Sequence, residues 1–118
     1  MSSESPVPSI TVQELRQKEM AGERFFLLDV RTEGEFVAGH LGFTSALVPH
    51  GTLPEHLDKL PSDKEMPIYN FCRSGRRSAG TTQYLRSLGY VRAYNVTGGI
   101  LAWVRAGYEI TSGVGGHW

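Results

Sequence analysis

The residues best suited to chemistry lie between positions 72 and 78, where the sequence reads Cys-Arg-Ser-Gly-Arg-Arg-Ser. Cys72 is the only cysteine of the 118-residue chain, and Arg73, Arg76 and Arg77 occupy three of the next five positions. A thiolate is the reactive form of cysteine, and its formation is favoured by nearby cations and by a helix N-terminus. The segment therefore predicts a nucleophilic Cys72 of lowered pKa, held in a nest of backbone N–H groups that suits a dianionic substrate.

The single cysteine also excludes several functions. It allows no disulfide within the chain and no Cys-x-x-Cys redox pair, so any oxidised state must involve another molecule. The histidines at positions 40, 50, 56 and 117 show no paired spacing with Cys72 that is typical of a zinc site. We therefore expect no bound metal.

The charge balance and the length of the chain narrow the classes of protein to which it can belong. The 12 lysine and arginine residues balance 12 aspartate and glutamate residues, so we expect no affinity for nucleic acid or for an anionic membrane. No apolar stretch approaches the roughly 20 residues that cross a bilayer, and the N-terminus lacks the features of a secretory signal. We expect a soluble, cytoplasmic protein with one domain over residues 9–111, a flexible leader at 1–8 and a flexible tail at 112–118.

Short apolar runs alternate with amphipathic stretches, which predicts an α/β fold with a parallel sheet covered by helices on both faces. Three Ser/Thr-x-x-Glu capping boxes mark expected helix starts, at Thr11 and Glu14, Thr32 and Glu35, and Thr52 and Glu55. The expected strands are 25–30, 45–48, 67–71 and 91–96, with a short one around Ile10.

The strand at 67–71 is expected in the centre of the sheet, with Cys72 directly after its carboxyl end. Ligands of open parallel sheets bind at this edge, where loops lead into the following helices. We expect a rigid strand to fix the cysteine while the loop leaves its sulfur open to solvent.

Four segments together give the chain its resemblance to a known family. They are Leu-Leu-Asp-Val-Arg at 27–31, Glu35-Phe36 followed by Gly39-His40, the segment 72–78, and Gly-Gly-Ile-Leu-Ala-Trp at 98–103. In this order and spacing the chain resembles a single-domain rhodanese, or thiosulfate sulfurtransferase, over about residues 10–110. The resemblance implies a three-layer α/β/α fold with a five-stranded parallel sheet.

The resemblance also implies sulfur transfer without a cofactor. Cys72 would attack the outer sulfur of a small anionic donor such as thiosulfate, and a thiol, cyanide or a sulfur-carrier protein would then accept that sulfur. The loop residues would bind the donor and stabilise the sulfur anions. The candidate site thus comprises Cys72 as nucleophile with Arg73, Ser74, Gly75, Arg76, Arg77 and Ser78.

Two other functions remain open. Cysteine phosphatases and arsenate reductases use Cys-x5-Arg, but here the sixth position after Cys72 is Ser78, and Arg77 falls one residue early. A rhodanese-like module without catalysis, which binds partners or senses redox state, is the second alternative, although such modules usually lack the cysteine. The segment after His40 departs from the Ile-Pro-Gly-Ala common in the family, which bears on the choice of acceptor.

Structural roles are expected for three conspicuous side chains. Asp29 should cap a turn or pair with Arg31, since a carboxylate beside the thiolate would raise the pKa of Cys72. His40 should be a hydrogen-bonded loop residue, and Trp103 should belong to the core. Gly98 and Gly99 should form a tight turn from strand to helix.

Overall fold

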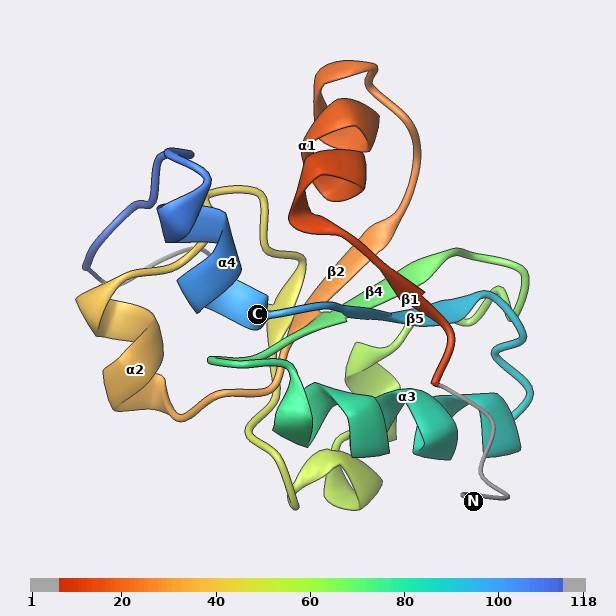
Figure 1. Ribbon diagram of the computed structural model, residues 1–118. Coiled ribbons are helices and arrows are strands. Elements are labelled where there is room, and N and C mark those ends of the chain that lie inside the picture. Colours follow the sequence, from red (N-terminus) through yellow and green to blue (C-terminus); the bar gives the residue numbers. More distant parts are fainter. Residues whose placement is uncertain (1–6, 114–118) are drawn as a thin grey trace, which may run out of the picture.

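The computed structural model describes residues 7–113, and most of the predicted leader and tail falls outside this range (Figure 1). Five parallel strands form one sheet in the order β1-β5-β4-β2-β3. The strands are β1 (Ser9–Ile10), β2 (Phe26–Asp29), β3 (Ala46–Leu47), β4 (Ile68–Phe71) and β5 (Ala93–Val96). The helices are α1 (Val12–Met20), α2 (Glu33–Ala38), α3 (Arg76–Ser87) and α4 (Gly99–Arg105), with 3₁₀ turns η1 (Leu53–Glu55) and η2 (Leu57–Lys59).

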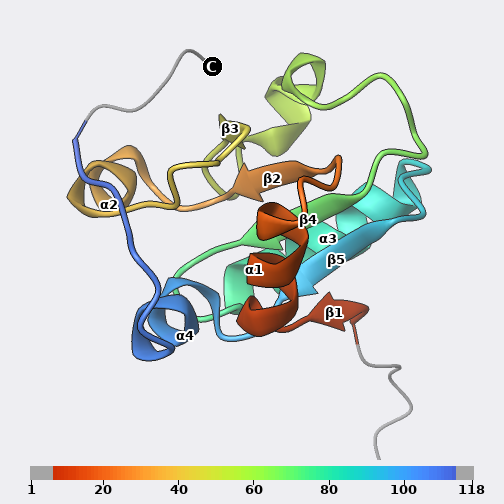
Figure 2. The same cartoon turned by 90° about the horizontal axis from the view of Figure 1, so that it is seen from above.

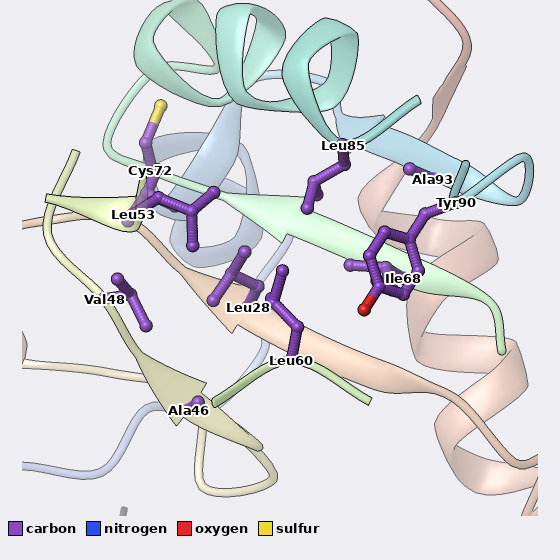
Figure 3. Close-up of a cluster of buried hydrophobic side chains, with 11 residues drawn as sticks. Leu28, Ala46, Val48, Leu53, Leu60, Ile68, Cys72, Leu85, Tyr90 and Ala93 are labelled. Carbon is purple, nitrogen blue, oxygen red and sulfur yellow. The ribbon is translucent and has the colours of Figure 1, made fainter. Parts of the chain in front are cut away.

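The sheet lies between two helical layers, as the sequence predicted. α1 and α3 cover opposite faces, and the view from above in Figure 2 shows α1 in front of the sheet and α3 behind it. One apolar cluster joins the sheet to α3 and the 3₁₀ turns, through residues such as Leu28, Leu53 and Leu85 (Figure 3). A second cluster packs Leu15 of α1 and Trp103 of α4 on the other face. The three-layer α/β/α architecture with its five-stranded parallel sheet is confirmed.

The central strand β4 is buried along its whole length and pairs with β2 on one side and β5 on the other. Parallel strands that are buried on both faces are typically continuous apolar runs, which is why the sequence identified them. Their carboxyl ends meet at one edge, where the loop after β4 leads into α3 (Figure 1).

Two of the three predicted capping boxes are confirmed. The Thr11 hydroxyl accepts the N–H of Glu14, and the Glu14 carboxylate accepts the N–H of Thr11. Thr32 and Glu35 make the same reciprocal pair at the start of α2. In residues 7–113 no helix is both long enough and apolar enough to cross a membrane.

The third predicted helix, starting at Thr52, is wrong. The Thr52 hydroxyl donates to the carbonyl of Pro49 at 2.7 Å and makes no side-chain cap with Glu55. The backbone instead closes short 3₁₀ turns, with the N–H of Glu55 bonded to the carbonyl of Thr52. Leu57, in the second of these turns, is 39% exposed, so its side chain does not pack into the core.

Candidate active site

Cys72 follows β4 directly and begins a tight loop that ends in the first turn of α3. Gly75 caps that helix with φ 93°, a left-handed conformation that favours glycine. A Cβ on Gly75 would also lie 3.1 Å from the backbone nitrogen of Gly98, so the loop packs closely on the strand-to-helix turn after β5. The sequence thus bends the chain back over the cysteine immediately after the strand.

Hydrogen-bond donors of the loop and of the start of α3 surround the sulfur of Cys72. The backbone N–H of Gly75 donates at 3.0 Å, the N–H of Ser78 at 3.5 Å, and the Ser78 hydroxyl lies 3.3 Å from the sulfur. Burial raises the pKa of Cys72, but the hydrogen bonds from Ser78, Gly75 and the Ser74 backbone outweigh it, so the pKa is lowered from its ordinary value. The direction agrees with the prediction, but the causes are backbone amides and the Ser78 hydroxyl, and the loop arginines are not among them.

The predicted solvent exposure of the sulfur is wrong. Cys72 is only 1% exposed and belongs to the apolar cluster under α3. In Figure 3 its sulfur points toward the start of α3, away from Leu28 and Val48. The loop covers it because Gly75 and Ser78 must approach the sulfur closely to donate to it. The sulfur is therefore buried among polar donors on one side and hydrocarbon on the other.

Asn95 of β5 completes the polar side of the sulfur site. Its amide nitrogen donates to the carbonyl of Gly75 at 3.2 Å, and its amide oxygen accepts the Ser78 hydroxyl. Asn95 thereby holds two residues that contact the sulfur. The sequence reasoning missed it, although a polar side chain inside an otherwise apolar strand was a usable signal.

The three loop arginines differ in their surroundings. Arg73 and Arg76 are exposed and form no salt bridge with a carboxylate of residues 7–113. Arg77 instead makes a bidentate pair with Glu35 of α2, with both nitrogen-to-oxygen distances 2.9 Å. The substrate contact expected of Arg77 stays a prediction. In the structure the Arg77 guanidinium is already paired with the Glu35 carboxylate. Ser74 is exposed beside Arg73.

The Glu35 carboxylate carries two roles, of which the sequence revealed only the capping box. Hydrogen bonds from Arg77 lower the pKa of Glu35 to about 2, against a smaller opposing effect of burial and with further help from the Thr32 N–H. The Glu35 bonds also raise the pKa of Arg77, to which the negative charge of Cys72 contributes. The two partners are 42 residues apart, so no local pattern could reveal the pair.

Asp29 and Arg31 form the structural pair that was expected. Both side chains are buried, and Arg31 Nη2 lies 2.8 Å from Asp29 Oδ2. Arg31 also donates to the carbonyls of Glu35 and Gly39, which ties α2 to the end of β2. The expected roles of His40 and Trp103 are confirmed as well: His40 is buried with Nδ1 2.8 Å from the Phe36 carbonyl, and Trp103 lies in the core.

The turn formed by Gly98 and Gly99 supports the loop from the other side. Both glycines have positive φ, and a Cβ on Gly99 would lie 2.2 Å from the carbonyl oxygen of Cys72. The first N–H groups of α4, from Ile100 and Leu101, bond the carbonyls of Cys72 and Arg73. The expected tight turn is confirmed, and it fixes the backbone of the cysteine itself.

An open pocket of about 540 Å³ lies between α2 and α4, beside the loop that follows Cys72. Arg73 and Glu35 line it together with apolar side chains of α4, including Leu101 and Val104. Phe43, from the segment that departs from the resembling family, packs on Phe25 and Trp103. It is not among the residues that line this pocket.

Known proteins resemble this chain in sequence and in fold. Residues 11–106 match the rhodanese-like domain family. The chain is 36% identical over 106 residues to a sulfurtransferase of Allochromatium vinosum, covering 90% of this chain and 96% of that protein. It is 35% identical over 78 residues to the thiosulfate sulfurtransferase GlpE of Tolumonas auensis, covering 65% of this chain and 70% of that protein.

A solved structure shows the same fold. The crystal structure of a rhodanese-like domain protein from Staphylococcus aureus matches with a TM-score of 0.76 at 36% identity, covering 89% of this chain and 99% of that one. The relatives support a general role in sulfur transfer. The family match and these similarities together show that the chain belongs to the rhodanese-like domain family.

Proposed function

We propose that this protein transfers sulfane sulfur from thiosulfate, or a related anionic donor, through a persulfide on Cys72. The observation that carries the proposal is the set of donors on the sulfur, from the Gly75 and Ser78 N–H groups and the Ser78 hydroxyl. These donors favour a thiolate, and a thiolate is what attacks a sulfur–sulfur bond.

The reaction needs no external oxidant or reductant. The Cys72 thiolate attacks the outer sulfur of thiosulfate, the sulfur–sulfur bond breaks, and sulfite leaves with the electron pair. The persulfide anion that remains accepts hydrogen bonds from the same loop donors as the thiolate did. A thiolate or cyanide then attacks the outer sulfur and carries it away, which restores the Cys72 thiolate.

Arg73 and Arg76 are the loop cations best placed to attract the donor, because both are exposed and neither is paired with a carboxylate of residues 7–113. Since Cys72 is buried, the donor reaches its sulfur through the loop that these side chains border. A small dianion suits such an approach better than a bulky substrate. A thiol, cyanide or a sulfur-carrier protein as acceptor, and a cytoplasmic location, belong to the same proposal.

Steady-state turnover of thiosulfate and cyanide to thiocyanate and sulfite tests the function. Wild-type protein should turn over, and Cys72→Ser should abolish turnover while circular dichroism shows the same fold. Arg73→Ala and Arg76→Ala should each raise the KM for thiosulfate, more at low salt because salt screens exposed charges. Folded wild-type protein without turnover, for cyanide and thiol acceptors alike, would favour the non-catalytic module instead.

A further inference from the structure

The pair of Glu35 and Arg77 joins α2 to the first turn of α3 beside the sulfur. Each carboxylate oxygen of Glu35 accepts one terminal nitrogen of Arg77 at 2.9 Å. The side chains are 30% and 32% exposed, so the pair is partly shielded from water. A bidentate, partly desolvated ion pair is stronger than a loose surface pair, and it leaves little positive charge for a second anion.

Glu35 also occupies a position that matters for an incoming anion. It lines the pocket of about 540 Å³ beside the loop, together with Arg73. Arg77 precedes Ser78, whose N–H and hydroxyl both contact the sulfur. An unpaired carboxylate at this place would repel a dianionic donor and would disfavour the Cys72 thiolate.

We propose that Arg77 serves donor binding by cancelling the charge of Glu35, and that Glu35 in turn limits the affinity of the site for anions. The guanidinium of Arg77 then stays on the carboxylate while Arg73 and Arg76 attract the donor. Glu35 and Arg77 are positioning and specificity-determining residues in this scheme, and the scheme rests on the sulfur transfer proposed above.

Counting charges gives the expected effect of each variant. Arg77→Gln uncovers the Glu35 carboxylate and removes one positive charge from the site, whereas Glu35→Gln frees Arg77 and adds one. The double variant leaves the net charge as in the wild type. Glutamine still completes a capping box, so Glu35→Gln keeps the start of α2 intact.

The experiment measures KM for two sulfur donors, dianionic thiosulfate and monoanionic benzenethiosulfonate, with cyanide as acceptor in all four proteins. For thiosulfate, Arg77→Gln should raise KM about tenfold and Glu35→Gln should lower it severalfold, as one unit charge near a dianion at the effective dielectric of a protein surface requires. The double variant should return to within about twofold of the wild type. Each shift should be smaller for the monoanion, close to the square root of the thiosulfate effect, and should shrink at high salt.

A double variant as impaired as Arg77→Gln would overturn the inference, because Arg77 would then contact the donor directly. Equal shifts for both donors would also overturn it, since the pair would then act by shaping the loop. Calorimetric Kd values for thiosulfate in a Cys72→Ser background should follow the same order of the four proteins. This binding series separates the two proposals: it can hold where turnover is absent, and it can fail where turnover is normal.

Discussion

The side-chain hydroxyl of Ser78 lies 3.3 Å from the sulfur of Cys72 and is also hydrogen-bonded to the amide oxygen of Asn95. The hydroxyl has one proton, so it donates fully to only one of these partners at a time. A thiolate or persulfide anion is the stronger acceptor, because hydrogen bonds to charged groups exceed those to neutral ones. The proton of Ser78 is thus available at the sulfur when the sulfur is anionic.

Ser78→Ala should raise the pKa of Cys72, because the thiolate loses its hydroxyl donor while the backbone N–H donors remain. Losing a hydrogen bond to a charged group should slow alkylation of Cys72 by iodoacetamide near neutral pH by about tenfold. Ser74→Ala is the matched control, since Ser74 acts through its backbone N–H. A pH–rate profile of alkylation measures both, and equal profiles for the two variants would contradict the role of the Ser78 hydroxyl.

Gly99→Ala should destabilise the protein and lower its activity. The new Cβ would meet the carbonyl oxygens of Cys72 at 2.2 Å and Arg73 at 2.6 Å, which are backbone atoms that hold the active loop. Overpacking of this kind costs about 1–3 kcal/mol, measured as the free energy of unfolding in urea. Gly80→Ala in α3 is the control, because nothing lies within 4 Å of its Cβ and alanine favours the helix. Similar losses in both variants would refute the steric argument.

Arg31→Met, just after the end of β2, should be strongly destabilising. It would leave the Asp29 carboxylate, which is 0% exposed, without its guanidinium partner. Breaking a buried pair in this way costs about 3–5 kcal/mol of unfolding free energy. Lys18→Met breaks the exposed pair with Glu23 and should cost less than about 1 kcal/mol. Chemical unfolding of both variants decides whether burial makes this difference.

The Glu35 pair should also give stability a pH dependence at acid pH. The pKa of Glu35 is lowered from 4.5 to about 2 in the folded protein, chiefly by hydrogen bonds from Arg77. The stabilisation is therefore fully present above 4.5 and is lost as the pH falls toward about 2. Urea unfolding of the wild type and Glu35→Gln should show a stability difference that shrinks over this interval. A difference that stays constant there would contradict the linkage.

Much of the fold followed from the sequence because buried parallel strands are apolar runs and capping boxes are local. The strand before Cys72 and the helix starts at Thr11 and Thr32 were identified for these reasons. The helix predicted from Thr52 was wrong because the same residue pattern also fits a turn. The Thr52 hydroxyl donates to the nearby carbonyl of Pro49 instead. Local spacing alone does not decide between these partners.

The loop at the centre of the candidate site could be predicted from the sequence, but the residues that other elements bring to it could not. The loop from Cys72 to Ser78 is contiguous, so its donors could be anticipated. Glu35 and Asn95 come from α2 and β5, and only the folded sheet brings them to the loop. The burial of Cys72 was also missed, since the charged sequence of the loop suggested solvent while its backbone folds over the sulfur.

The most direct test is the intact mass of the protein after incubation with thiosulfate and removal of the excess. The wild type should gain the mass of one sulfur atom, lose it again on addition of cyanide, and show no gain as Cys72→Ser. Folded wild-type protein that keeps its original mass would contradict the claim that Cys72 carries a persulfide.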